Sequence, residues 1–354
     1  MTTELSQTPR RDTRLRAAAL DLDSSSERGL ESLSLGVGAV AFVLVALVAL
    51  VVFHFEPAPI SGPGSVGQYA AIASGVVAIL AFLAGRYITR TPGHRLGALD
   101  VIDIAALAFA HGVIALLTWT LLAVILEQSF LGATVFALPA LIISGAAAAV
   151  TAYATFYSAT HLDLQLLALL LAVFLTEGVI ASMLTASDPD WWKNNLSALG
   201  MTDDISALAF NLTIIIAGVI VTTLARYATK GIPTPNPHGV ARATATLVVV
   251  GVFLACVGLF PVDQFFALHT GVASGMVVAY GVLVIRLPHW IPGMPRAFVL
   301  LGWLFLAVTL VLAVLFFVGY YTLTAVELVA GILVFAWIIL FIRNADALQH
   351  DSGR

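Results

Sequence analysis

The chain has 354 residues, of which 60% are hydrophobic and only 10% are charged, and its formal net charge is −4. Soluble globular proteins carry about 25% charged residues, so this composition excludes a water-soluble globular fold. The single cysteine, Cys256, excludes an intramolecular disulfide and a cysteine-rich metal or iron–sulfur site. The acidic balance shows no basic footprint for nucleic acid, and we expect no nucleic-acid partner.

The chain begins and ends with polar segments. Residues 1–32 carry five arginines and no apolar core followed by a small-residue cleavage site, so a signal peptide is not expected. We expect 1–32 to be a disordered cytoplasmic tail and 343–354 to be a second cytoplasmic tail.

Ten apolar segments lie between these tails, each long enough to cross about 30 Å of hydrocarbon as a helix. They cover residues 33–55, 68–87, 101–126, 133–157, 163–185, 205–226, 241–260, 264–286, 296–318 and 321–342. Pro139 is the only proline expected inside one of them. The sequence therefore predicts an all-α, polytopic integral membrane helical bundle of about ten transmembrane helices.

The basic residues predict the orientation of the bundle. If the N-terminus is cytoplasmic and ten helices alternate, all of the 16 Lys and Arg residues except Lys193 fall on the cytoplasmic side. Cytoplasmic loops are enriched in Lys and Arg. We therefore expect both termini to be cytoplasmic and the protein to lie in the plasma (inner) membrane.

Three short segments recur in order, which indicates a possible duplication. Residues 60–64 resemble 196–200, residues 86–90 resemble 226–230, and residues 127–130 resemble 263–266. These matches favour a parallel repeat of four plus four helices followed by two C-terminal helices. Chance similarity within apolar sequence is the alternative.

Four polar residues lie inside predicted spans at a common depth, about 8–12 Å below the outer surface. They are Glu177, Asn211, His269 and Glu327. A carboxylate at the centre of a span costs roughly 2.5–3.5 kcal/mol on insertion scales, so such residues need an explanation. A polar pocket open to the outer face would explain them, and so would hydrogen bonds between helices that serve packing alone.

The loop over residues 186–204 would cap this pocket. Its candidate ligand-binding residues, with one from the turn after residue 260, are Asp188, Asp190, Lys193, Asn195, Ser197 and Asp263. His269 is the candidate general base and Asp263 or Asn211 would orient it. Ser197 is a possible nucleophile, although a turn or helix-capping role is the simpler interpretation.

No motif in the chain predicts a metal or a cofactor. The sequence contains no HExxH, GxSxG, Walker loop or GxGxxG spacing. His111 lies in the middle of a predicted span, where a satisfied core histidine is the common case. We expect no metal site and no cofactor.

Several of these elements together resemble a known family. Asp190–Gly200, then Asn211, then Gly258–Asp263 and His269 resemble the bacterial membrane-protein family called domain of unknown function 998. The resemblance covers residues 163–342, which would form a six-helix core, and leaves 33–160 as a four-helix N-terminal membrane extension. It implies a bacterial plasma-membrane protein and implies no activity.

Three functions fit these observations. The first is binding or processing of a lipid or small amphiphile at the outer pocket, as an enzyme or as a binding protein. The second is a secondary transporter, coupled to protons through Glu177 and Glu327. The third is an accessory or structural membrane subunit with a protein partner that the sequence does not identify. The lipid bilayer is the one partner that all three require.

Overall fold

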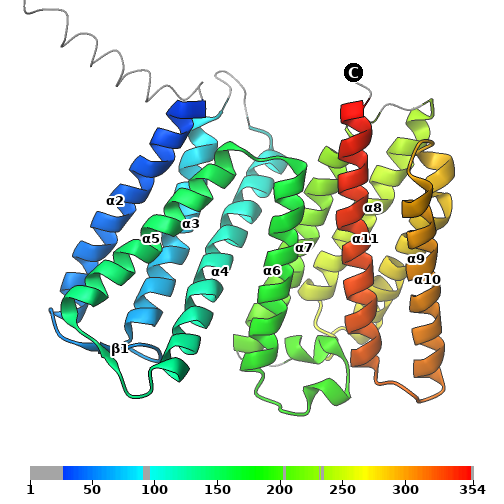
Figure 1. The fold of residues 1–354 in the computed structure, drawn as a ribbon. Coiled ribbons are helices and arrows are strands. Elements are labelled where there is room, and N and C mark those ends of the chain that lie inside the picture. The colour runs from blue at the N-terminus through cyan, green and yellow to red at the C-terminus, as the bar shows by residue number, and fades with distance from the viewer. Residues whose placement is uncertain (1–26, 91–95, 202–204, 231, 233–234, 352–354) are drawn as a thin grey trace, which may run out of the picture. The chain divides into compact units, whose positions relative to one another are not determined.

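The computed structural model of the chain describes residues 27–90, 96–201, 205–230, 232 and 235–351. Within them, ten helices are long and apolar enough to cross a membrane (Figure 1). Their bounds are Glu27–Phe53 (α2), Val66–Ile88 (α3), Ala98–Ser129 (α4), Ala137–Thr160 (α5), Leu164–Thr185 (α6), Ile205–Thr229 (α7), Pro237–Leu259 (α8), Phe266–Trp290 (α9), Arg296–Phe317 (α10) and Leu323–Asp351 (α11). The expected all-α, multi-pass membrane protein is confirmed.

Helix starts follow local hydrogen bonding. The Ser65 side chain accepts the N–H of Gln68 before α3, and the Asp163 side chain accepts the N–H of Leu166 before α6. Such caps satisfy N–H groups that have no partner within the helix. In α8, Asn236 caps the helix and Pro237 occupies its first position, where a missing N–H costs nothing.

The first and last helices are longer than hydropathy predicts. Helix α2 begins at Glu27 and not at residue 33, and α11 continues to Asp351 and not to 342. The expected disorder is therefore wrong over 27–32, and the C-terminal segment is helical over 343–351, while 1–26 and 352–354 lie outside the described residues. Hydropathy identifies only the apolar part of a helix. The backbone hydrogen bonds of a helix can continue into the polar residues beyond it. At the end of α11, the Gln349 side chain also donates to the carbonyl of Ala228 on α7 at 2.9 Å.

The proline prediction is also corrected. Pro139 is the third residue of α5, where it interrupts no helical hydrogen bond, and Pro288 lies inside α9, which runs on to Trp290. The expected span covered the apolar segment and ended at 286, two residues before this proline. Here it falls in the last turn.

Contacts between residues divide the chain into two compact units. Unit 1 takes the residues up to Ile104 together with His111–Leu162, and unit 2 takes Ala105–Ala110 and the residues from Asp163 on. The boundary between α5 and α6 falls where the predicted N-terminal extension ends.

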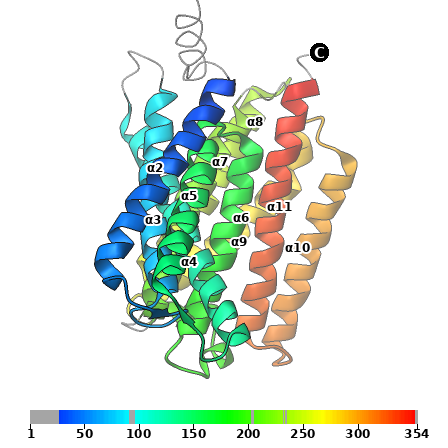
Figure 2. The ribbon, with the colours of Figure 1, turned by 60° about the vertical axis from the view of Figure 1, so that its left-hand side comes forward.

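In unit 1, helix α5 packs against both α2 and α3 (Figure 2). Its buried face is made of small residues, among them Gly145, Ala148 and Ala152. Lipid tails are as apolar as leucine, so membrane helices associate through small residues that let their backbones approach. At one end of the unit two short strands, β1 (Ala58–Pro59) and β2 (Thr134–Val135), pair in antiparallel fashion.

In unit 2, helices α6, α7, α8 and α9 pack in chain order, and α11 contacts α6, α7 and α10 (Figure 1). Helices α7 and α8 approach each other closely. A Cβ added to Gly218 would lie 2.4 Å from the carbonyl oxygen of Gly251. A fully buried aromatic cluster around Trp337 and Tyr280, whose ring centroids lie 5.5 Å apart, connects α11 with α9.

The two sets of four helices pack differently. In the first set the fourth helix, α5, lies against the first and second, whereas in the second set the fourth helix, α9, lies against the third, α8. The packing therefore adds no support to the predicted four-plus-four repeat.

Candidate functional site

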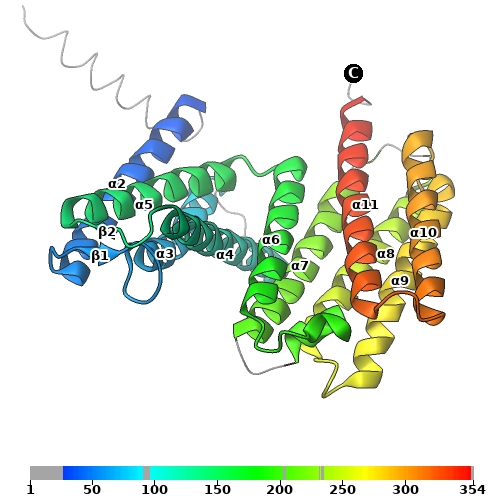
Figure 3. The same cartoon turned by 60° about the horizontal axis from the view of Figure 1, so that its bottom comes forward.

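The segment that joins α6 to α7 closes one end of unit 2 (Figure 3). It forms two short 3-10 helices, η1 (Trp191–Lys193) and η2 (Leu196–Gly200). Helix η2 contacts both α7 and α11. Residues 202–204, with Asp203 and Asp204, lie outside the described part of the chain.

His269 and Ser197 form a hydrogen-bonded pair at this end. His269 is 6% exposed in the first turn of α9, and its Nε2 lies 3.0 Å from the Ser197 hydroxyl oxygen in η2. Its Nδ1 lies 2.7 Å from the carbonyl oxygen of Phe260. A carbonyl only accepts, so Nδ1 carries a proton and Nε2 of the neutral ring accepts from Ser197. This is the arrangement in which a histidine acts as general base toward a serine hydroxyl.

The turn before α9 creates this geometry. The chain leaves α8 at Leu259, and the Phe265 N–H donates to the carbonyl of Pro261 at 2.9 Å. The turn thereby leaves the carbonyl of Phe260 facing the His269 ring. The predicted orienting residues differ from this: Asp263 is exposed, and Asn211 hydrogen-bonds elsewhere. A backbone carbonyl carries no side-chain signal, so the sequence could not single it out.

Two further side chains hold the backbone of η2. The N–H of Leu196 donates to Glu327 Oε2 at 2.6 Å, and Asn211 Nδ2 donates to the carbonyl of Gly200 at 3.0 Å. A Cβ added to Gly200 would lie 2.4 Å from Asn211 Oδ1, so a larger residue here would displace the Asn211 amide. Helices α7, α9 and α11 thus each contribute one predicted polar residue to the same short segment.

The remaining predicted residues lie in different surroundings. Glu177 is half-buried in α6 and takes part in none of these three contacts. The Asn195 side chain is half-buried, and its Oδ1 is buried with no hydrogen-bond partner among the described residues. A buried amide oxygen without a partner costs about 1–3 kcal/mol, and a bound polar group would satisfy it.

The charged residues of the loop are exposed. Lys193 pairs with Asp190 at 2.9 Å, with both side chains more than half exposed, and Asp188 Oδ1 accepts the N–H of Asp190 at 2.8 Å. The Lys193 ammonium also lies 5.6 Å from the ring centre of Trp192. Of the predicted ligand-binding residues, only His269 is buried, and the charged residues of the loop form an exposed rim.

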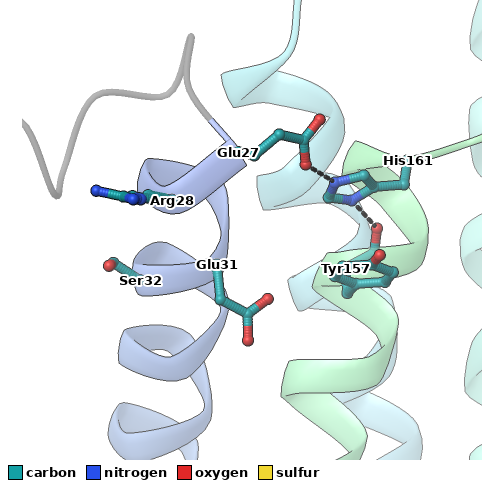
Figure 4. A pocket seen from close by; sticks show the side chains of 6 residues that line it. All are labelled: Glu27, Arg28, Glu31, Ser32, Tyr157 and His161. Atoms are coloured by element: carbon teal, nitrogen blue, oxygen red, sulfur yellow. Dashed lines mark hydrogen bonds and ion pairs between the residues drawn. The ribbon is translucent and has the colours of Figure 1, made fainter.

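Unit 1 contains an open surface pocket of about 520 Å³, lined by polar residues, that the sequence did not reveal (Figure 4). Glu27 and Glu31 of α2 face Tyr157 and His161 of α5, and Glu27 Oε2 lies 3.2 Å from His161 Nε2. Both pairs are spaced four residues apart, which places each pair on one helix face. The spacing could have been recognised, but Glu27 and Glu31 fell inside the segment expected to be a disordered tail.

No metal centre or known relative is found. Among the described residues, no three His, Cys, Asp or Glu side chains are grouped so that they could hold a metal ion. Comparison of the chain with protein-family models, curated proteins and solved structures finds no match. The function is therefore inferred from the geometry alone.

Proposed function

We propose that this multi-pass membrane protein binds and processes a lipid or another amphiphile at the η2 end of unit 2. The observation that carries the proposal is the Ser197–His269 hydrogen bond, in which the Phe260 carbonyl holds the proton on Nδ1. A histidine held in this tautomer can take the proton of the serine as its oxygen attacks an acyl carbon, and the protonated ring can return that proton to the leaving oxygen as the acyl–oxygen bond breaks. A water molecule then releases the acyl group from the serine by the same proton transfers in reverse.

The surroundings of the pair favour an amphiphile. Phe265, Phe266 and Leu268 are neighbours of His269 in the chain and have exposed side chains. The polar group of Ser197 is brought to them by its hydrogen bond with His269, and Asn195 lies two positions before Ser197. Aromatic side chains are typical of the membrane–water interface. A molecule with a polar head and an apolar chain would therefore meet both kinds of surface here.

The orientation of this site is part of the proposal. In unit 2, Lys193 lies in the loop that joins α6 to α7, whereas Arg226, Arg242 and Arg286 lie near the opposite ends of α7, α8 and α9. The positive-inside rule then puts the η2 end outside and the termini in the cytoplasm. We also propose that the protein lies in the plasma membrane of a bacterium and that it belongs to the family called domain of unknown function 998. Both proposals rest on the sequence.

Two alternatives have less support. A proton-coupled transporter would use Glu327, but this carboxylate accepts the N–H of Leu196 in the loop. An accessory subunit would need a docking face. The face of α9 around Gly271 is open, since a Cβ added there would meet no atom within 4 Å, yet no partner is indicated.

Native mass spectrometry with lipid analysis tests the proposal, on protein purified in mild detergent. Wild type is compared with His269→Ala, Ser197→Ala and the matched control His289→Ala, which removes an exposed histidine near the end of α9. We expect a defined lipid or its cleavage product on the wild type and the control. The two site variants should lose it or carry the uncleaved form. The same unselective lipid on all four proteins would reject the site.

A further inference from the structure

Unit 1 contains a second, apolar cavity of about 380 Å³ between α3, α4, α5 and β2. Cavities of roughly 300–1,000 Å³ are the usual size of small-molecule sites. Its lining is almost wholly hydrocarbon, contributed by residues such as Ile60, Ala123, Leu126, Phe130, Phe136 and Ile143.

Two lining side chains carry a polar hydrogen, Trp119 and the exposed Thr134, and that of Trp119 is already used. Trp119 lies half-buried in the cavity wall, and its Nε1 donates to the Thr151 hydroxyl of α5 at 2.8 Å. The indole therefore presents its apolar ring to the cavity. An apolar chain is the natural occupant of such a space, because a chain leaves no polar group unsatisfied there.

The rim of the cavity carries a negative charge. The Ser61 hydroxyl donates to Glu127 Oε2, and these two residues directly follow the lining residues Ile60 and Leu126. Among the described residues, no basic side chain forms an ion pair with Glu127. The segments 54–66 and 124–137, which form this end of the unit, contain Glu56 and Glu127 and no Lys or Arg.

We propose that this cavity binds a cationic amphiphile, with its hydrocarbon chain between α4 and α5 and its ammonium group beside Glu127. The carboxylate at the rim would attract an ammonium and repel an anionic headgroup at the same depth. This site shares no residue with the Ser197–His269 pair, so either proposal can fail while the other stands.

The native tryptophan provides the readout. The full chain is placed in phosphatidylcholine nanodiscs and titrated with two probes whose twelve-carbon chains end in bromine, one a trimethylammonium and the other a carboxylate. Bromine quenches a tryptophan that it touches, and the difference from Trp119→Phe isolates the share of Trp119 among the six tryptophans. The ratio of the two apparent Kd values is compared between variants, so that the partition of each probe into lipid cancels.

We expect saturable quenching of Trp119 and tighter binding of the cation. Glu127→Gln should shift the ratio by about fivefold toward the anion, the size of a partly exposed ion pair, and Glu127→Lys should shift it further. Ala133→Phe, which fills the cavity, should weaken both probes. The matched controls Glu56→Gln and Leu131→Phe are exposed neighbours outside the lining and should behave as wild type.

Three results would overturn the proposal. One is quenching that is unchanged in Trp119→Phe, which would show that the chain does not enter the cavity. Another is a ratio that stays the same in the Gln and Lys variants at 127. The last is an anion preference in the wild type, which would assign the cavity to a fatty acid or an anionic lipid.

Discussion

His269 and Ser197 are separated by 72 positions in the chain, yet their side chains lie 3.0 Å apart and form one hydrogen bond. The bond joins the first turn of α9 to the 3-10 helix between α6 and α7. The bond holds the loop against α9, and in the proposed function it would also prepare the serine for proton transfer.

The Ser197–His269 bond should be measurable as a coupling energy. We expect a double-mutant cycle of Ser197→Ala and His269→Ala to give a coupling of about 0.6 kcal/mol in the free energy of unfolding, and at most about 1.7 kcal/mol, the average and the maximum found for side-chain hydrogen bonds inside a membrane protein. Thermal unfolding in detergent measures it. The His111–Ser158 pair of unit 1, at 2.9 Å, provides a comparison cycle. Additive effects at 197 and 269 would contradict the geometry.

Glu327 should control the opening of the loop. Glu327→Ala removes the acceptor for the Leu196 N–H, and a hydrogen bond to a charged group contributes about 1.5–3 kcal/mol. Amide hydrogen exchange at Leu196 should therefore become about tenfold to a hundredfold faster. Glu327→Gln keeps a carbonyl acceptor and should show a much smaller change. Equal exchange in the wild type and the Ala variant would show that another group holds this amide.

The contact between α7 and α8 should tolerate no side chain. A Cβ added to Gly218 would lie 2.4 Å from the Gly251 carbonyl oxygen and 2.6 Å from the Ala255 nitrogen, both of them backbone atoms. We expect Gly218→Ala to destabilise the protein by about 1–3 kcal/mol, since the helices must separate. Gly271→Ala on α9 is the control. It meets open space and should be neutral or slightly stabilising. The apparent Tm of each variant is compared with that of the wild type, and it should fall for Gly218→Ala only.

Labelling of single cysteines checks the orientation. In a Cys256→Ala background, a cysteine is introduced at Asp188 in the loop or at His238 in the first turn of α8, both of them exposed positions. A membrane-impermeant maleimide should label Asp188→Cys in intact cells and His238→Cys only after the cells are broken. The reverse pattern would place the η2 end in the cytoplasm and remove the basis for an outer-leaflet ligand.

The sequence predicts the depth of the polar residues in the membrane but not their contacts. Asn211, His269 and Glu327 were expected at one level of the membrane, and each of them now contacts the segment 196–200. Hydropathy and rise per residue give the depth of a residue along its helix. They do not give the direction in which its side chain points, so the partners Gly200, Ser197 and Leu196 could not be assigned.

The sequence by itself determined the class of this protein and the number of its apolar helices. In lipid every backbone polar group needs an internal partner, so a long apolar segment has to be a helix whatever its neighbours are. Only the tertiary structure decided which helices touch, that the Phe260 carbonyl holds His269, and that Glu127 stands at the rim of an apolar cavity. These features depend on helix rotation and on backbone atoms. Both arise from packing between segments far apart in the chain, about which local hydrophobicity carries no information.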